Sequence, residues 1–387
     1  MTLEIVRLAD YCEIVSGATP RRDHPEYWGG DIAWVTPKDI RDLDGAILAD
    51  TPEHITQTGY DSCSTRLLPK RSVLFSSRAP IGLVAITGRE MCTNQGFKSL
   101  IPGPDVDAGY LYWCLKREAP RIAAKSSGTT FTEISRKGME QVKIPLPPLP
   151  EQRRIAAILD KADAVRRKRQ RTLDLADQFL RSVFLDLFGD PVTNPKGWPQ
   201  RQVQDLCRVV RGSSPRPKAD PRYYGGPVPR LMVADITRDG WFVTPRIDSL
   251  TEGGAKLSRP LPKGTVVMVV SGDVGVVAML EIDACIHDGF VGFPDLEKSD
   301  LLPEYFLLTL HFLKATHEQR RAGAIWQNLT THDIKRMRVA IPPLAIQERS
   351  LHILAGLRKV GEREALAIRE TESLASSLTQ RAFRGEL

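Results

Sequence analysis

The segment Gly17-Ala18-Thr19-Pro20 returns as Gly212-Ser213-Ser214-Pro215, about 195 residues further along the chain. Nearly the same offset pairs Tyr27-Trp28-Gly29-Gly30 with Tyr223-Tyr224-Gly225-Gly226. Chance does not produce agreement at several places with an almost constant offset. The sequence therefore predicts two copies of one structural unit.

Each copy begins as a globule and ends as a long helix. Runs rich in β-branched and aromatic residues, such as Ser72–Phe75 and Gly264–Ser271, are bounded by Gly and Pro and predict strands. Helical stretches are expected near Tyr110–Ala119 and Tyr305–Ala315. A proline-rich segment then closes each globule, because proline ends regular pairing and stiffens the exit.

These patterns predict an α+β fold with a pseudo-twofold internal repeat. Two similar mixed α/β domains are separated by two long helices that pair as an antiparallel coiled coil. The expected boundaries are residues 1–150 for the first globule, 151–190 for the central helix, 191–345 for the second globule and 346–387 for the C-terminal helix.

Composition limits the class of protein. A chain of 387 residues is too long for one core, and 42% apolar with 26% charged residues is ordinary for a soluble globular protein. A net charge of +7 favours polyanionic partners. The six cysteines form no CxxC pair and no apolar run reaches the roughly 20 residues that span a bilayer. We therefore expect a cytoplasmic protein without disulfides, metal or membrane contact.

Both helical runs carry apolar residues at alternating spacings of three and four. This 3.5-residue period is typical of a coiled coil, and the alternative is that each helix packs on its own globule. The seam positions include Ile158, Val165, Arg169 and Phe179 in the first run and Ile353, Val360, Glu364 and Leu374 in the second.

The middle seam positions of the two runs are Arg169 and Glu364. In a symmetric antiparallel pair they would meet, so we expect a charge pair that fixes the register. The alternative is that each side chain extends separately to water. A seam from 155 to 183 would span roughly 40 Å at about 1.5 Å per residue. DNA half-sites one helical turn apart lie about 34–36 Å from each other, so the helices suit a spacer between two DNA-binding globules.

The segment from Ile144 to Asp160, IPLPPLPEQRRIAAILD, closely resembles the specificity subunit of type I restriction-modification systems. So do LFGDPVTNPKGW at 187–198, Ile341-Pro342-Pro343-Leu344, and Ala382-Phe383-Arg384-Gly385-Glu386-Leu387 at the end of the sequence. The second copy departs slightly, with Ala345-Ile346 where the first has Pro-Glu before the glutamine.

The resemblance implies that each globule is a target recognition domain that reads one half of a gapped sequence in double-stranded DNA. It implies that the helices set the gap and dock two methylation subunits, which bind S-adenosylmethionine and methylate adenine. Two restriction subunits with translocase and nuclease activity would complete the complex. In this family the specificity subunit catalyses nothing.

The expected DNA contacts are basic, amide and hydroxyl side chains in loops beside the strands, because cations bind phosphates and bidentate groups read base edges. The alternative for any one position is ordinary solvated surface. Positions that differ between the copies are favoured, such as Asn94-Gln95 against His287-Asp288. The candidates of the first globule are Arg21, Arg22, Lys38, Ser77, Arg78, Asn94, Gln95, Lys98, Lys125, Ser126, Thr129 and Thr130. Those of the second are Arg216, Lys218, Arg222, Arg238, Ser271, Asp273, His287, Asp288, Arg320, Arg321, Gln327, Asn328 and His332.

Catalytic motifs are not found in the sequence. Asp220-Pro221-Arg222-Tyr223 lacks the second proline of an adenine methyltransferase motif, and there is no GxxxxGK[ST] loop for nucleotide hydrolysis. Two other classes stay open: a standalone DNA-modifying enzyme, and a coiled-coil scaffold that binds no DNA. Methyl transfer by the isolated chain would indicate the first, and absence of salt-sensitive, sequence-selective DNA binding would indicate the second.

Overall fold

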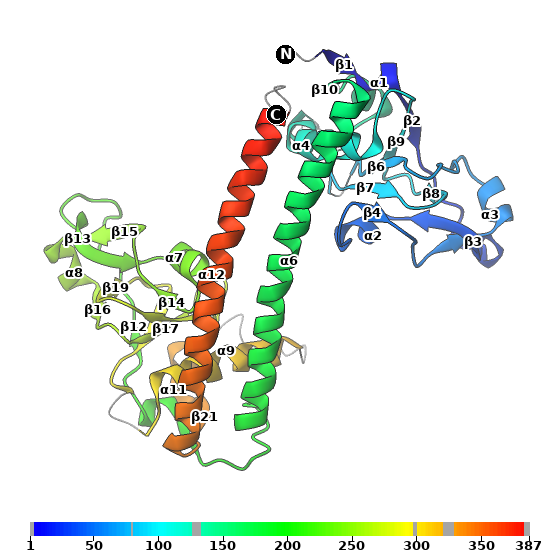
Figure 1. The fold of residues 1–387 in the computed structure, drawn as a ribbon. Helices are drawn as coiled ribbons and strands as arrows, with labels where there is room; N and C mark the ends of the chain where they lie inside the picture. Colours follow the sequence, from blue (N-terminus) through cyan, green and yellow to red (C-terminus); the bar gives the residue numbers. More distant parts are fainter. Residues whose placement is uncertain (1–3, 79, 126–132, 297–299, 320–328, 383–387) are drawn as a thin grey trace. The chain divides into compact units, whose positions relative to one another are not determined.

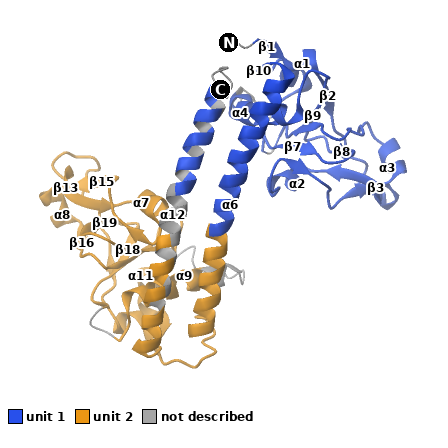
Figure 2. Cartoon of the chain, viewed as in Figure 1, with its two compact units in different colours: residues 1–172, 364–387 blue, residues 173–363 orange. Residues whose placement is uncertain are grey.

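The computed structural model describes residues 4–78, 80–125, 133–296, 300–319 and 329–382. The chain divides into two compact units, residues 1–172 with 364–387 and residues 173–363 (Figure 2). Each unit therefore contains one globule together with parts of both long helices. These helices are α6 (Leu149–Phe188) and α12 (Leu344–Ala382), drawn in green and orange-red in Figure 1.

The first unit is built on a five-stranded sheet in the order β2-β9-β6-β7-β4 and a three-stranded sheet in the order β5-β3-β8. A short antiparallel pair, β1-β10, joins the two ends of the globule. The strands are β1 (Ile5–Arg7), β2 (Cys12–Ser16), β3 (Trp28–Val35), β4 (Ile47–Leu48), β5 (His54–Ile55), β6 (Val73–Phe75), β7 (Val84–Thr87), β8 (Met91–Thr93), β9 (Lys98–Pro102) and β10 (Lys143–Pro145). The helices are α1 (Leu8–Tyr11), η1 (Pro25–Tyr27), α2 (Pro37–Arg41), α3 (Gln57–Asp61), α4 (Ala108–Lys125) and α5 (Arg136–Glu140).

The second unit repeats this topology with one additional strand, β16. Its five-stranded sheet has the order β12-β20-β17-β18-β14, its second sheet the order β15-β13-β19-β16, and β11-β21 forms the closing pair. The strands are β11 (Gln200–Gln202), β12 (Val210–Arg211), β13 (Tyr224–Leu231), β14 (Phe242–Val243), β15 (Asp248–Leu250), β16 (Arg259–Leu261), β17 (Val266–Val269), β18 (Val277–Leu280), β19 (Ala284–Ile286), β20 (Phe290–Phe293) and β21 (Arg338–Ala340). The helices are η2 (Val203–Asp205), α7 (Val233–Asp239), α8 (Glu252–Leu257), α9 (Pro303–Gln319) and α11 (Thr331–Arg336).

The internal repeat predicted from the sequence is thus confirmed as a repeat of folds. The extra strand β16 has a reduced counterpart in the first unit, where Leu68 makes a single bridge to Met91. The expected helices near Tyr110–Ala119 and Tyr305–Ala315 correspond to α4 and α9. The division into four domains with the boundaries given above stays a prediction.

Each globule buries the end of a long helix in its core. In the first unit, Ile155 and Leu159 of α6 join the cluster around Tyr110, and Leu378 of α12 packs against it. In the second unit, Phe184 and Phe188 pack against aromatic rings of α9 in tilted arrangements, with centroids 4.6 Å from Phe312 and 4.7 Å from Tyr305 respectively. Apolar contact of this kind fixes the helix ends to the globules.

The continuous buried seam expected along the helices needs correction. Val165, Phe179 and Leu374 are 45%, 60% and 57% exposed. At the end of α6 the buried positions are Leu180, Phe184 and Phe188 instead, spaced by four residues and turned toward the globule. The rings of α9 cover Phe184 and Phe188, so at this end of α6 that face is buried and Phe179 is not.

At the middle of the first helix, Arg169 lies half-buried and donates from its guanidinium to the carbonyl of Ala367 and the hydroxyl of Thr371. Both acceptors lie in the part of α12 that belongs to the same unit. The side chains of Ile353, Val360 and Glu364 lie outside the described residues, so the Arg169–Glu364 pair stays a prediction. Ile158 is half-buried.

Candidate nucleic-acid interface

A glycine bulge shapes the same strand in both units. The pairing of β3 with β5 shifts register between Trp28 and Ile32, and that of β13 with β15 shifts between Tyr224 and Val228. At the bulge, Gly29 has a φ of 80° and Gly225 a φ of 79°, a conformation that side chains with a Cβ rarely adopt. The repeated glycine pairs, Gly29-Gly30 and Gly225-Gly226, therefore maintain the backbone frame that the two units share.

Two loops are tied together next to this bulge in the same way in both units. In the first unit Thr19 hydrogen-bonds Gln95, and in the second Ser214 donates to the carboxylate of Asp288 at 2.5 Å. The backbone N–H of Gly96 donates to Oδ1 of Asn94, and that of Gly289 to Nδ1 of His287, at 2.9 Å in each case. Asn94 and His287, both predicted DNA contacts, thus each use one acceptor atom to cap the turn in which they lie.

The first unit builds a cation–aromatic cluster on this frame. The guanidinium carbon of Arg22 lies 3.9 Å from the ring centre of Trp28 and 4.9 Å from that of Trp34. Arg22 also pairs with Glu53 at 2.8 Å, which lowers the pKa of that carboxyl. The indole N–H of Trp34 donates to the carbonyl of Ala18. Arg22 is the exposed member of the cluster, and Trp34 is fully buried.

The second unit places a different side chain at the matched position. Trp34 pairs with Cys92 across β3 and β8, and Arg230 pairs with Cys285 across β13 and β19, so residues 34 and 230 are equivalent. Arg230 is buried, donates to Asp248 at 2.5 Å and to Ser214 at 2.8 Å, and lies 5.4 Å from the ring centre of Tyr224. The backbone is conserved between the copies while the interior side chains are exchanged.

Sequence analysis missed most members of these two clusters. The missed residues are Trp28, Trp34, Glu53, Arg230 and Asp248. Four of them lie in strands, whereas the DNA contacts were expected in loops. The signal was the spacing from the glycine motif, since Trp34 and Arg230 both stand six residues after the aromatic residue of the bulge.

Two predicted contacts lie inside the first globule. Ser77 and Lys98 are 0% and 7% exposed and both bind the carboxylate of Glu133, at 3.1 Å each. Lys98 begins strand β9 and does not lie in a loop as expected. Their positions favour a structural role, because a buried charge needs a partner and this one has it.

The other described candidates lie on or near the surface. Arg21 and Arg222 each pair with a carboxylate two residues away, while Arg238 pairs with Asp235 and Asp239. Asp273 pairs with Lys314. Lys38, Gln95, Arg216, Lys218, Ser271, Asp288 and His332 are exposed, and Arg78, Asn94 and His287 are partly buried. The side chain of Lys125 and residues Ser126, Thr129, Thr130, Arg320, Arg321, Gln327 and Asn328 lie outside the described residues.

The arginine-rich run at residues 166–171, in the middle of α6, forms ion pairs with carboxylates of its own unit. Arg167 pairs with Asp44 at 2.9 Å and with Asp163 at 2.8 Å, and Arg171 also binds Asp44. The pairing lowers the pKa of Asp44, with the hydrogen bond from Arg167 as the largest cause. These arginines therefore attach the loop after α2 to the helix.

A buried glutamine joins each long helix to its globule. Gln152 donates to the carbonyls of Asp105 and Pro147 at 2.8 Å each and accepts from the N–H of Asp107 at 2.8 Å. Gln347 makes the same three bonds, to the carbonyls of Asp300 and Pro342 and from the N–H of Leu302. The PEQ and AIQ segments thus share one structural reason for their glutamine.

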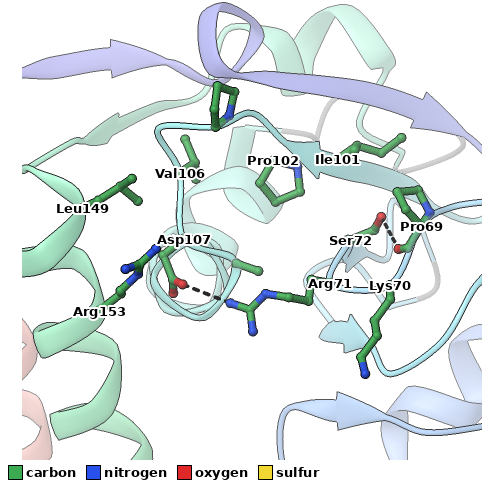
Figure 3. Close-up of a pocket in the computed structure, with 12 residues that line it drawn as sticks. Pro69, Lys70, Arg71, Ser72, Ile101, Pro102, Val106, Asp107, Leu149 and Arg153 are labelled. Carbon is green, nitrogen blue, oxygen red and sulfur yellow. Dashed lines mark hydrogen bonds and ion pairs between the residues drawn. The ribbon is translucent and has the colours of Figure 1, made fainter.

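Beside this joint the first unit has a cavity of about 580 Å³ (Figure 3). Lys70, Arg71 and Arg153 line it, and Arg71 pairs with Asp107 at 3.0 Å. These basic side chains come from a loop before β6 and from the first turns of α6.

The described residues include no group of three or more His, Cys, Asp and Glu side chains arranged to hold a metal ion. Nor is any described helix both long and apolar enough to cross a membrane. All six cysteines are free, and burial raises the pKa of the Cys12 and Cys207 thiols to about 12, which keeps them unreactive.

A family model for the type I restriction modification DNA specificity domain matches residues 2–174 and again residues 195–365. The chain belongs to this family. It is 31% identical over 252 residues to the MjaIX specificity subunit of Methanocaldococcus jannaschii, which covers 61% of this chain and 58% of that protein. It is 32% identical over 160 residues to the EcoR124I/EcoR124II specificity subunit of Escherichia coli, which covers 38% of each chain. The chain thus matches well under two thirds of the length of these relatives.

Solved structures share the fold over the whole chain. The S subunit of a type I restriction-modification system from M. genitalium matches with a TM-score of 0.59 at 14% identity, over 98% of this chain and 96% of that one. A chain from a type I system solved to describe complex assembly and conformational transition matches with a TM-score of 0.52 at 20% identity, over 100% and 98%. These matches confirm the predicted fold class of the specificity subunit.

Proposed function

We propose that this chain reads a two-part, gapped sequence in double-stranded DNA and directs the methylation and restriction subunits of a type I system to it. The observation that carries the proposal is that the two units share one backbone topology but have different side chains at equivalent positions, such as Trp34 and Arg230. Two domains that read different half-sites need a common docking geometry and a local difference in base-reading groups. A net charge of +7 supports a polyanionic partner.

In the proposed complex the chain works in the cytoplasm and contributes sequence recognition without catalysis. Two methylation subunits bind S-adenosylmethionine and carry out the methyl transfer to adenine, and two restriction subunits supply translocation and cleavage. The specificity subunits named among the relatives support this division of labour. The long helices α6 and α12 act as the spacer that sets the gap between the half-sites.

Methylation mapping of genomic DNA tests this proposal. The chain is expressed together with its neighbouring methylation subunit, and the control is that subunit alone. We expect a gapped adenine motif with two defined halves only when the chain is present. Absence of any sequence motif would contradict the proposal and favour a scaffold, whereas methylation by the isolated chain would indicate an enzyme.

A further inference from the structure

The second unit has a pocket of about 560 Å³ in front of strand β13. Its wall includes Ser214, Tyr224, Arg230, Asp248 and His287, which come from the loop after β12, from β13 and β15, and from the turn after β19. All of these elements belong to one unit. Arg230 occupies the position that Trp34 has in the first unit. The pocket therefore lies where a guanidinium replaces an indole.

The guanidinium of Arg230 has partners at two of its three nitrogens. Nη1 donates to Asp248 and to the sulfur of Met232, and Nη2 donates to Ser214, but Nε is buried and has no hydrogen-bond partner. A buried donor without an acceptor costs free energy, and such groups often mark a site that is completed by a ligand. The Arg230 side chain is about nine-tenths buried, so its position is fixed before any ligand arrives.

His287 adds a second donor to the same wall. Because its Nδ1 accepts from the N–H of Gly289, a neutral ring carries its proton on Nε2. Burial and the charge of Arg230 lower the pKa of His287, which favours the neutral ring at pH 7. The matched residue Asn94 caps the equivalent turn with its amide oxygen and so presents an NH2 group in place of an imidazole.

The charges around the pocket balance. Lys218 and Arg230 are opposed by Asp248 and Asp288, so the lining offers donors and acceptors with no net charge. A phosphate would require an excess of positive charge, whereas the edge of a base is neutral and presents donors and acceptors together. Tyr224 supplies an aromatic wall of the pocket. Arg216 is exposed next to Asp288, where it could contact the phosphate backbone of the DNA.

We propose that this pocket reads a base edge in the half-site bound by the second unit, and that Arg230 and His287 determine which base pair is accepted. In the first unit, Arg22 and Asn94 lie beside the buried Trp34 and read the other half-site with different chemistry. The inference rests on the proposed function and assigns residues to it.

The exchange His287→Asn tests the proposal, because it installs the residue that already caps this turn in the first unit. The complex with the methylation subunit is assayed on the wild-type duplex and on every single base-pair change in both halves, at two salt concentrations. We expect discrimination to change about fivefold or more at one or two adjacent base pairs of a single half-site. The reciprocal Asn94→His should change the other half, and Arg230→Lys should act on the same base pairs as His287→Asn. The control His352→Asn replaces an exposed histidine of α12 and should change neither half.

Two results would overturn the proposal. Uniform weakening on all duplexes, with a smaller dependence on salt, would identify a phosphate contact. Unchanged discrimination in both His287→Asn and Arg230→Lys would place the reading site elsewhere. A wild-type complex that methylates without sequence preference would instead contradict the proposed function itself, so the two failures are distinguishable.

Discussion

The two units use one backbone for two interiors, and the difference is concentrated at residues 34 and 230. In the first unit the buried indole of Trp34 fills the space, and the cation Arg22 lies outside it in contact with solvent. In the second unit the cation Arg230 lies inside and the space is open. Recognition can thus diverge between duplicated domains by moving a charge between loop and strand, with no change in the topology around it.

Removing the two matched side chains should separate their roles most clearly. Trp34→Ala removes a fully buried ring that packs with Ile55 and Cys92, so we expect a loss of about 3–5 kcal/mol in the free energy of unfolding. Arg230→Ala leaves the carboxylate of Asp248 unpaired in a partly open pocket and should cost about 1–3 kcal/mol. Urea titration measures both, and an equal or larger cost at Arg230 would contradict the distinction.

The glutamine joints should behave alike, in contrast to the reading sites. Gln152→Ala and Gln347→Ala each remove three hydrogen bonds of a buried side chain at the start of a long helix, and each should cost about 1–3 kcal/mol. The exposed Gln204→Ala serves as control and should stay within about 0.5 kcal/mol of wild type. A large difference between the two joints in urea titration would show that the repeat is not energetically symmetric.

Arg22→Ala should affect recognition more than stability. The exposed pair with Glu53 and the contact with Trp28 each stabilise the fold by no more than about 1 kcal/mol. Base preference in the first half-site should nevertheless change in the methylation assay. The control Arg136→Ala removes an equally exposed arginine that pairs with Glu140, and it should leave the preference as it is. A change in both variants would argue against a specific role for Arg22.

The smallest expected effect is a dependence of stability on pH in the second unit. The pKa of His287 is lowered below 6.5 in the folded state, so the unfolded chain binds a proton first as the pH falls. Stability from this group is therefore present above pH 6.5 and is lost as the pH falls through the folded pKa. Arg230 and Lys218 strengthen the shift, while Asp288 and Asp248 oppose it. His287→Asn should flatten the unfolding free energy in this window, and an unchanged slope would exclude His287 as its source.

The repeat made the frame predictable, and side-chain exchange limited what could be predicted of the site. The repeated glycine motifs predicted a shared structural unit, and the structure shows Gly29 and Gly225 at the same bulge with a φ near 80°, which glycine readily adopts. Residues 34 and 230 were not predicted because they lie in strands, whereas the DNA contacts were expected in loops. The heptad pattern predicted burial at Phe179, but Phe179 is exposed. Phe184 and Phe188 are buried instead, because they pack against the rings of α9. Periodicity reports which faces of a helix are apolar, and tertiary contacts decide which of them is covered.

Exchange of residues 1–150 for the corresponding domain of another family member, followed by methylation mapping of genomic DNA, tests the modular account most directly. The second unit and its pocket stay unchanged in such a chimera. We predict that one half of the methylated motif changes to that of the donor while the other half is retained. A motif in which both halves change together would contradict the assignment of one reading site to each globule.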